Sequence, residues 1–344
     1  MEILIGLLII AVGAFCQSSS YVPINRIKSW SWESYWIVQG FFAWLLFPLL
    51  GALLAVPQGH TLCELYAQGN GFNLFMTLFF GVLWGIGGLT FGLSMRYLGV
   101  ALGQSIALGT CAALGTVLGP VMLNVFYPEA GHLEKLTASV LIGVCVTLVG
   151  IAVIGIAGSM KSSTLSEEEK KEAVKDFNFP KGILIALLAG FMSGCFNVGL
   201  DFGSEIAFPE TDAMYKALPA TLLVTIGGFL TNAVYCFAQN QRNQTWGDYR
   251  NAKVWLNNLL FCALAGALWY SQFFGLSLGQ GFLQNAPDLL TFSFCILMAL
   301  NVTFSNLWGI ILKEWKGCSP STVAVLLLGL LILIASSFVP QLLQ

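Results

Sequence analysis

The sequence predicts an all-α polytopic membrane protein, with ten transmembrane helices arranged as two inverted five-helix repeats. Three observations lead to this fold class. The chain of 344 residues is 57% hydrophobic and only 9% charged, whereas soluble globular proteins are about 45–50% apolar and roughly 25% charged. Ten stretches are long and apolar enough to cross a bilayer. Lysine and arginine gather in alternate connections between these stretches, as the positive-inside rule expects.

The composition also excludes several classes of protein. Fifteen Lys+Arg and 17 Asp+Glu cannot cover the surface of a soluble chain of this length, which excludes a soluble enzyme and a disordered chain. The formal net charge of −2 leaves no basic surface for nucleic acid. A β-barrel is excluded because transmembrane strands are only about 9–11 residues long. The expected surroundings are therefore a lipid bilayer, and no nucleic-acid partner is expected.

The first five predicted spans cover residues 3–20, 35–56, 72–95, 98–117 and 136–158. Each holds about 20 mostly apolar residues, enough to cross roughly 30 Å of hydrocarbon. Polar, turn-forming residues separate them, such as Pro57-Gln58-Gly59-His60 and Arg96-Tyr97. Only Met1-Glu2 precedes the first span, without the basic region of a secretory signal. We therefore expect the first span to be retained.

Residues 159–181 form the longest connection and include the charged run Glu167 to Glu172. We expect a short charged linker on the cytoplasmic side, and its composition favours a helix. It divides the chain into an N-terminal five-helix repeat, residues 1–158, and a C-terminal five-helix repeat, residues 182–344. Five is odd, so the second repeat enters the membrane with the opposite orientation. One faint internal match supports the repeat, because Gly81-Val82-Leu83-Trp84 resembles Gly266-Ala267-Leu268-Trp269.

The last five predicted spans cover residues 182–200, 218–238, 254–278, 289–311 and 322–339. Small residues recur at spacings of three or four residues within the spans, as at Gly81, Gly85, Gly88 and Gly92 in the third. This spacing lets membrane helices approach closely. Tight static packing and helices that slide or bend both remain open interpretations.

The distribution of Lys and Arg predicts the orientation. Of the 15 residues, only Lys135 and Lys216 fall in connections after even-numbered spans. The other connections are therefore expected in the cytoplasm, with both termini on the outer, periplasmic side. Four tryptophans near the cytoplasmic boundary are expected to be interface anchors. They are Trp30, Trp32, Trp36 and Trp315.

No catalytic, metal-binding or cofactor-binding pattern occurs in the sequence. It contains no GxxxxGK[ST] phosphate-binding loop, no HExxH motif and no CxxC pair. One GxSxG match, Gly275 to Gly279, lies inside a predicted span rather than at the strand-to-helix turn where this motif holds a catalytic serine. An ion or solute gradient is therefore the expected energy source. Inverted repeats are typical of secondary transporters, in which the substrate binds near the midplane between the repeats.

Polar and aromatic side chains within the spans suit a neutral polyhydroxylated ligand, which needs apolar stacking surfaces together with hydrogen-bond donors and acceptors. Serine and threonine in spans usually bond to their own helix, so amides and aromatic rings are the better candidates. The predicted substrate-binding residues are Gln17, Tyr21, Trp84, Gln104, Asn197, Trp269, Gln272 and Asn306.

Two carboxylates near the end of the sixth span are the candidates for proton coupling. Asp201 lies about 30 Å along the helix from Lys181, at 1.5 Å per residue, which puts it near the outer boundary. Glu205 follows one turn later. Charges within spans are costly and often functional. Asp201 is thus either an interfacial carboxylate in water or the group that carries the proton, and sodium coupling also stays open.

Several segments together have a family likeness. These are Arg26-Ile27-Lys28-Ser29-Trp30-Ser31-Trp32-Glu33, Trp84-Gly85-Ile86-Gly87-Gly88, Met95-Arg96-Tyr97-Leu98-Gly99, Trp269-Tyr270-Ser271-Gln272 and Leu312-Lys313-Glu314-Trp315-Lys316. In this order the chain resembles the L-rhamnose–proton symporter (RhaT) family, within the drug/metabolite transporter superfamily, over essentially its whole length.

The resemblance implies a ten-helix carrier in the bacterial inner membrane that imports a deoxy sugar, L-rhamnose or a similar one, together with a proton. An exporter or exchanger of another small metabolite on the same fold is the alternative. A membrane protein that senses sugar without transporting it is a third possibility, and a membrane enzyme is the last. The sequence predicts no oligomeric state.

Overall fold

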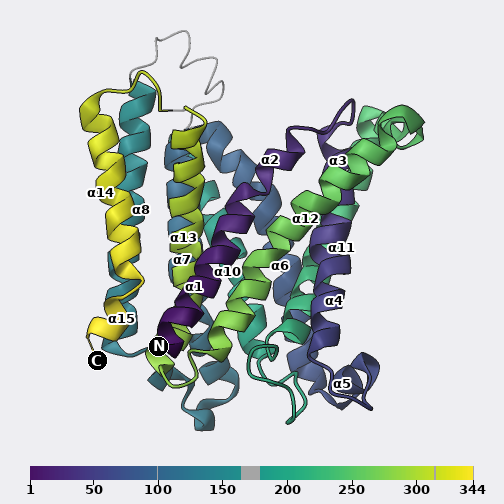
Figure 1. Ribbon diagram of the computed structural model, residues 1–344, viewed down its shortest axis with the longest axis vertical. Helices are drawn as coiled ribbons and strands as arrows, with labels where there is room; N and C mark the ends of the chain where they lie inside the picture. The colour runs from purple at the N-terminus through teal and green to yellow at the C-terminus, as the bar shows by residue number, and fades with distance from the viewer. Residues whose placement is uncertain (99, 164–178, 314, 344) are drawn as a thin grey trace. The chain divides into compact units, whose positions relative to one another are not determined.

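The computed structural model describes residues 1–98, 100–163, 179–313 and 315–343, and within these ranges the chain is helical with short turns (Figure 1). In the first half the helices are α1 (Glu2–Ser19), α2 (Tyr21–Ile24), α3 (Trp32–Gly40), η1 (Phe41–Leu46), α4 (Phe47–Leu54), α5 (Leu62–Gln68), α6 (Gly71–Leu98), α7 (Val100–Phe126), η2 (Pro128–Ala130), η3 (His132–Lys135) and α8 (Ala138–Ser163). In the second half they are α10 (Phe179–Phe202), α11 (Leu218–Asn243), η4 (Thr245–Arg250), α12 (Ala252–Gly281), α13 (Pro287–Ile311), α14 (Pro320–Ser336) and α15 (Val339–Leu342).

Nine helical segments in the described ranges are long and apolar enough to cross a membrane. They correspond to the first nine predicted spans, with α3, η1 and α4 forming one continuous segment, Trp32–Leu54. The tenth predicted span corresponds to α14, which has 17 residues. This is short of the roughly 20 residues of a typical span. The chain is therefore a multi-pass membrane protein, and the tenth crossing stays a prediction.

One predicted boundary was wrong. The sequence placed the end of the fourth span at residue 117, but α7 continues to Phe126 with Pro120 inside it. Proline usually ends a helix because it lacks an N–H and crowds the preceding turn. Membrane helices tolerate it where neighbouring groups satisfy the freed backbone carbonyl. Most of the predicted linker, residues 164–178, lies outside the described residues.

The chain forms two compact units, each assembled from both sequence halves. Unit 1 comprises Met1–Gly85 and Gly199–Gln284, and unit 2 comprises Ile86–Val198 and Asn285–Gln344. The units change over inside α6 and α10 rather than at the linker. The predicted division into two five-helix repeats rests on the order of the spans along the chain and not on these contacts. It stays a prediction.

Glycines hold the helices of unit 1 close together. A Cβ atom on Gly81 of α6 would lie 2.2 Å from the Val224 carbonyl oxygen of α11, and one on Gly227 of α11 would lie 2.4 Å from the Leu78 carbonyl oxygen of α6. No side chain fits at these distances, so the two backbones touch directly. Thr231 adds a hydrogen bond from Oγ1 to the Val82 carbonyl oxygen at 3.1 Å. Gly81 therefore serves close helix packing, whereas a Cβ atom on Gly88 of the same helix would meet no atom within 4 Å.

The α1 and α12 helices of unit 1 lie side by side in the same manner. A Cβ atom on Gly13 would be 2.7 Å from the Ser271 carbonyl oxygen, and one on Gly6 would be 2.8 Å from the Gly279 carbonyl oxygen. Two contacts seven residues apart on α1 keep one face of this helix against α12 over two turns.

Unit 2 has its apolar core between α8, α13 and α14. Fully buried side chains there include Ala157, Ala299, Leu326 and Leu333. Small residues again allow the approach, since a Cβ atom on Gly150 of α8 would lie 2.7 Å from a Leu333 methyl group of α14. In Figure 1, α8 and α14 run alongside each other.

A hydrogen-bonded clamp in unit 1 fixes the connection between α2 and α3. Asn258 of α12 grips Lys28 by both backbone groups, accepting from its N–H at 3.0 Å and donating to its carbonyl oxygen at 2.8 Å. The Asp248 carboxylate accepts from the N–H and the hydroxyl of Ser31 at 2.8 and 2.7 Å. The Trp30 indole N–H donates to the Asp248 carbonyl oxygen at 2.9 Å. The connection is thus tied to η4 and α12 by side chains distant in sequence.

The clamp continues along α3. The Glu33 carboxylate, only 5% exposed, accepts from Asn243 Nδ2 at 3.0 Å and from Thr245 Oγ1 at 2.8 Å. Ser34 donates to the Asn240 side-chain oxygen at 3.0 Å. A buried carboxylate is tolerable only when hydrogen bonds replace its hydration. The Asn243 and Thr245 side chains supply them here.

The tryptophans near α3 differ in their surroundings, and their role as interface anchors stays a prediction. Trp30 is buried and its N–H bonds to η4. The Trp36 N–H donates to Asn232 Oδ1 of α11 at 3.0 Å. Trp32, by contrast, is 41% exposed, as an anchor would be. The Trp-rich segment therefore holds α3 against its neighbours as well as lying near the boundary.

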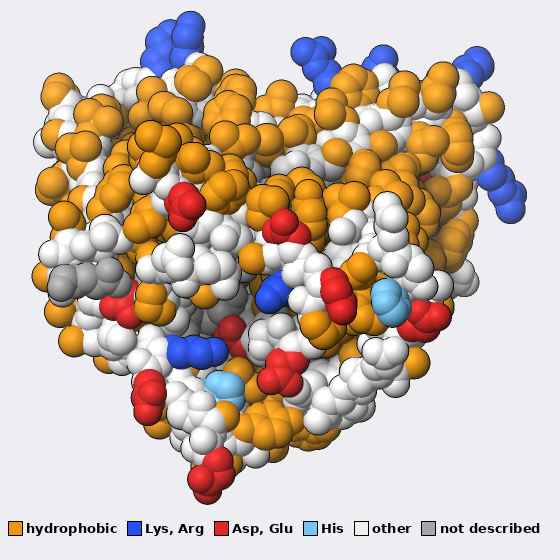
Figure 2. All heavy atoms as spheres, turned by 60° about the horizontal axis from the view of Figure 1, so that its bottom comes forward, with side chains coloured by type: hydrophobic (Ala, Val, Ile, Leu, Met, Phe, Trp, Pro, Cys, Tyr) orange, Lys and Arg blue, Asp and Glu red, His pale blue; other side chains and the backbone are white. Residues whose placement is uncertain are grey.

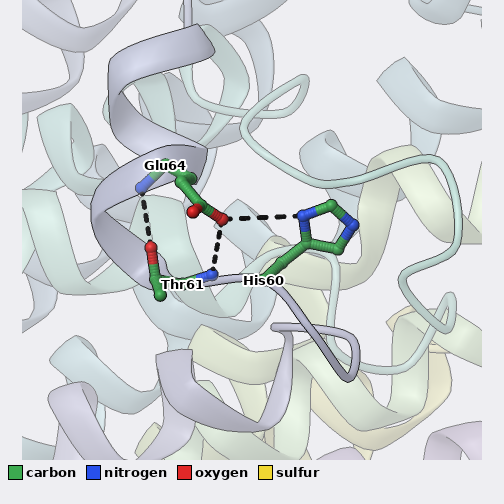
Figure 3. A network of polar contacts seen from close by, with 3 residues as sticks. All are labelled: His60, Thr61 and Glu64. Carbon is green, nitrogen blue, oxygen red and sulfur yellow. Dashed lines mark hydrogen bonds and ion pairs between the residues drawn. The ribbon is translucent and has the colours of Figure 1, made fainter.

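The short helix α5 is set by local capping (Figure 3). Thr61 Oγ1 accepts from the Glu64 N–H at 3.2 Å, and the Glu64 carboxylate accepts from the Thr61 N–H at 2.9 Å, which forms a capping box. The same carboxylate lies 3.6 Å from His60 Nδ1, and the His60 ring stacks on Phe208 at 4.5 Å between centroids. The cap starts α5 at a defined residue after the turn at Gly59.

The surface agrees with lipid as the main solvent. Large apolar side chains are exposed along the helices of both units, including Leu8, Phe75, Val234, Leu260 and Leu331. Figure 2 shows that hydrophobic side chains make up much of the visible surface, with charged side chains sparse among them. A protein in water rarely exposes so much contiguous apolar surface.

We expect Gly81→Ala to destabilise the protein, because its added methyl group would overlap the backbone of α11. Overpacking of this kind costs about 1–3 kcal/mol. Gly71→Ala is the matched control, since it lies in the same helix with no atom within 4 Å of the added group. Thermal unfolding in detergent should show a lower midpoint for the first variant only. Equal midpoints for the two variants would contradict close packing at Gly81.

We expect Asp248→Asn to weaken the clamp in a pH-dependent way. Burial opposes the charged form of Asp248, but the hydrogen bonds from Ser31 and Ser34 outweigh it and lower the pKa of this carboxyl below its ordinary value. The folded protein therefore gains stability wherever the carboxylate is ionised, and loses this gain only as the pH falls through the lowered pKa.

The difference in unfolding midpoint between wild type and Asp248→Asn should thus stay constant from about pH 8 to pH 5 and shrink only below about pH 4, near the ordinary aspartate pKa. Asp212→Asn, an exposed acid in another connection, controls for the charge change itself. A difference that already disappears near pH 6 would show that the ionised carboxylate does not stabilise the clamp.

Candidate functional site

Three tryptophans from three helical segments meet inside unit 1. Trp44 of η1 makes edge-to-face contacts with Trp84 of α6 and Trp269 of α12, each at 5.9 Å between ring centroids. Trp84 and Trp269 themselves lie 5.7 Å apart at 34°. We call these three residues the tryptophan cluster. Trp44 is buried, whereas Trp84 and Trp269 are only partly buried, so the cluster combines a covered ring with two accessible ones.

The glycine at 228 determines how Trp84 lies in this cluster. A Cβ atom on Gly228 of α11 would be 2.1 Å from the Trp84 ring. The ring therefore occupies the space that a side chain at 228 would fill. Any larger residue there would push Trp84 out of its position.

Two buried polar atoms on the span Trp32–Leu54 have no hydrogen-bond partner among the described residues. They are the indole Nε1 of Trp44 and the side-chain oxygen Oε1 of Gln39. The two side chains are 5% and 4% exposed. A buried donor or acceptor without a partner costs about 1–3 kcal/mol. Such atoms are few in native proteins, and each calls for an explanation.

Three other tryptophans in unit 1 show the usual behaviour. The indole N–H groups of Trp30, Trp36 and Trp246 each donate a hydrogen bond, at 2.9 to 3.1 Å. Buried tryptophans normally find such a partner. Trp44 departs from this pattern although it lies within the same bundle and is among the most buried of these residues.

The local helix geometry places Trp44 in the cluster. Residues Phe41–Leu46 form a π-helix, closed by a bond from the Phe47 N–H to the Phe42 carbonyl oxygen. Pro48 follows at the start of α4 and removes the N–H that would otherwise bond the Trp44 carbonyl oxygen in an α-helix. The π-helix is a rare form that often occurs at functional sites. The ring of Trp44 folds back over Gly40, where a Cβ atom would lie 2.5 Å from it.

A third unpartnered atom, Tyr270 Oη, has a different setting. It fills the notch at Gly51 of α4, lying 2.0 Å from where a Cβ atom would be. The hydroxyl is therefore enclosed by the helix backbone. Because the Tyr270 hydroxyl packs directly against the backbone at Gly51, we assign Tyr270 to packing between α12 and α4.

The structure brings together only some of the residues predicted for substrate binding. Trp84 and Trp269 are neighbours, as described above. Gln272 lies one turn after Trp269, but it is buried where α1 crosses α12 and donates to the Trp269 carbonyl oxygen at 3.1 Å. Gln17 of α1 is partly buried and accepts from the Ser18 hydroxyl at 3.4 Å. Tyr21 of α2 is 58% exposed.

The predicted carboxylates lie where α10 ends, in the part of the chain that belongs to unit 1. Asp201 is partly buried in the last turn of α10, and Glu205 is exposed in the turns that follow. Their roles in proton coupling stay predictions.

In unit 2, the predicted residues bond to helix backbone. Asn197 of α10 donates from Nδ2 to the Gly115 carbonyl oxygen of α7 at 2.8 Å, which ties the two helices. Asn306 donates to the Val302 carbonyl oxygen of its own helix at 2.9 Å. The side chain of Gln104 lies outside the described part of the structure.

The sequence reasoning did not single out Gln39 and Trp44. A signal was present, because an amide and a tryptophan stand within one otherwise apolar span, with Pro48 just beyond them. No group of three or more His, Cys, Asp or Glu side chains in the described residues has a metal-binding arrangement.

Comparison with known proteins identifies the family. A profile of the family described as L-rhamnose-proton symport protein (RhaT) matches residues 1–342. Two relatives named L-rhamnose-proton symporter are similar over nearly their full lengths. The one from Yersinia pestis (strain Pestoides F) is 32% identical over 348 residues, 97% of this chain and 96% of the relative. The one from Salmonella typhi is 33% identical over 344 residues, 95% of this chain and 94% of the relative. The chain therefore belongs to the RhaT family of L-rhamnose-proton symport proteins.

Proposed function

We propose that the protein imports L-rhamnose, or a closely similar deoxy sugar, together with a proton across the bacterial inner membrane. The observation that carries this proposal is the family match over residues 1–342, together with relatives of the same length that bear the name of this activity. The energy source is then the proton gradient.

The tryptophan cluster supports a sugar as the substrate. A pyranose has apolar C–H faces and a polar rim of hydroxyl groups. Partly buried indole rings such as those of Trp84 and Trp269 offer apolar faces for stacking. Under this proposal these two rings bind the sugar. The other residues predicted from the sequence stay candidates for polar contacts with it, and they are Gln17, Tyr21, Gln104, Asn197, Gln272 and Asn306.

The same cluster favours the inverted repeat and alternating access. Trp84 and Trp269 stand at equivalent places in the two similar segments of the proposed repeats, residues 81–84 and 266–269. They come from opposite sequence halves and are neighbours at 5.7 Å. A substrate site near the pseudo-symmetry axis is typical of transporters that rock two repeats about it. We infer a ten-helix transporter, in which α14, about 26 Å long at 1.5 Å per residue, makes the tenth crossing.

The charged ends of the helices support the proposed orientation. In unit 1 the clamp brings the connection with Arg26 and Lys28 to the same end as η4 and the start of α12, with Arg250 and Lys253. In unit 2, Lys161 at the end of α8 lies 4.7 Å from the Trp315 ring, in the connection after α13. We assign these ends to the cytoplasm and both termini to the periplasmic side.

We expect purified wild-type protein in proteoliposomes to accumulate radiolabelled L-rhamnose when an inward proton gradient is imposed. A protonophore should abolish the accumulation and leave only equilibration. Vesicles without protein are the control for leakage. Accumulation that survives the protonophore, or that requires a sodium gradient, would refute proton symport. Uptake of other solutes in place of L-rhamnose would point to an exchanger of another metabolite.

Asp201 is the carboxylate that we propose carries the proton, with Glu205 near it. We expect Asp201→Asn to lose gradient-driven accumulation by at least tenfold while retaining exchange of labelled for unlabelled L-rhamnose, because exchange needs no net proton movement. Glu210→Gln, an exposed acid in the connection after α10, is the control and should keep both activities. Full gradient-driven accumulation by Asp201→Asn would show that another group couples the proton.

A further inference from the structure

We propose that the buried indole N–H of Trp44 and the amide oxygen of Gln39 bind the hydroxyl groups of the transported sugar and so select its hydroxyl pattern. The inference rests on the proposed function, because it assigns to that sugar a polar contact in unit 1. It concerns two residues that the sequence reasoning had not connected with the substrate.

The first step is the contrast among neighbouring tryptophans. Trp36 and Trp44 lie in the same span and touch each other at 5.6 Å between ring centroids. Trp36 donates its N–H to Asn232 Oδ1, but Trp44 Nε1 has no partner in the part of the chain that the structure describes. A buried indole N–H usually has a partner, so the partner of Trp44 is expected to come from outside the chain.

The second step is the complementarity of the two unpartnered atoms. Trp44 offers a donor and Gln39 offers an acceptor, and a hydroxyl group both accepts and donates. The two residues are five positions apart, and the Trp44 ring folds back over Gly40, the neighbour of Gln39. The two residues therefore stand little more than one helical turn apart on the same span. An ion would satisfy only one of the two atoms, whereas a sugar hydroxyl, or two adjacent hydroxyls, satisfies both.

The third step is the position of the pair in the tryptophan cluster. Trp44 makes edge-to-face contacts with both Trp84 and Trp269, the rings that stay partly exposed. A pyranose stacked on the accessible rings would present its polar edge toward the buried ring. Apolar faces with a few fixed polar groups are the usual composition of a specific small-molecule site.

The fourth step is the backbone. The π-helix at Phe41–Leu46 changes the direction of the side chains after Gln39 relative to a regular α-helix. The π-helix also packs tightly against α12, because a Cβ atom on Gly266 of α12 would lie 2.9 Å from the Ala43 backbone nitrogen. The turn that carries Trp44 is therefore fixed in place against α12, which suits a group that must hold a substrate in one orientation.

The test uses full-length protein in detergent and in proteoliposomes, with L-rhamnose and a set of its analogues that each lack one ring hydroxyl. Trp44→Phe keeps an aromatic ring but removes the N–H, and Gln39→Leu removes the amide oxygen at similar size. Trp36→Phe is the matched control, since it removes an N–H that the protein itself satisfies.

We expect Trp44→Phe and Gln39→Leu each to weaken L-rhamnose binding, and to raise its KM, about three- to tenfold, the range of one hydrogen bond. The wild type should bind one analogue, which lacks the hydroxyl that contacts Trp44 or Gln39, about three- to tenfold more weakly than L-rhamnose. The variant that lacks the protein group for this hydroxyl should bind that analogue and L-rhamnose equally well. Without sugar, Trp44→Phe should lower the unfolding temperature less than Trp36→Phe does, because the two variants lose the same ring volume but only the second also loses a hydrogen bond. Trp36→Phe should unfold at a lower temperature and keep the wild-type order of analogues.

The outcomes separate the two proposals. Unchanged L-rhamnose affinity in both variants, or an unchanged order of analogues, would overturn the present inference and leave these atoms as features of packing. Wild-type protein that binds L-rhamnose without proton-driven accumulation would refute the proposed function alone. Wild-type protein that binds no L-rhamnose would overturn both.

Discussion

The fold depends on direct contact between helix backbones at glycine. Apolar side chains give helices little reason to associate in lipid, because the acyl chains are as apolar as they are. Van der Waals contacts and interhelical hydrogen bonds must then hold the helices together, and both require the helices to approach closely. In unit 1 this approach occurs at Gly81 and Gly227 between α6 and α11, and at Gly6 and Gly13 between α1 and α12. The tryptophan rings and the clamp occupy positions that these crossings define.

Polar side chains in this protein fall into two groups by how completely the chain satisfies them. The clamp around Asp248, Glu33 and Asn258 is a closed network whose members are bonded to one another or to backbone. Asn197 likewise bonds across to α7. Trp44 and Gln39 stand apart because each keeps a buried atom without a partner. A stable fold tolerates such atoms where binding makes use of them.

Much of the fold could be predicted from the sequence, because hydropathy over about 20 residues directly reports the length of a membrane span. Nine of the predicted spans correspond to apolar helices of sufficient length. The end of α7 was missed because the helix continues through Pro120 to Phe126, and nothing in the apolar pattern marks that continuation. The grouping of helices into two units could not be predicted, since it depends on contacts between residues far apart in the sequence.

The candidate site was predictable only in part. Trp84 and Trp269 stood out as aromatic residues in similar segments, and they do meet. Gln272 and Asn197 looked equally suitable in sequence, but each bonds to backbone carbonyls at a helix crossing. Nothing local in the sequence distinguishes an amide that links helices from one that faces a ligand. Trp44 was missed because its position depends on a π-helical turn, which a regular period of 3.6 residues does not represent.

The π-helix has a consequence for the span as a whole. It accommodates about one more residue per turn than an α-helix does, so it offsets the angular phase of α4 relative to α3 by roughly 100°. Residues on either side of it that face α12, such as Gln39 and Gly51, are in register only because of this offset. Deleting a single residue between them would convert the turn to α-helix without shortening the span appreciably. It would also rotate half of the span away from its neighbours, so the length of this short segment is as constrained as its composition.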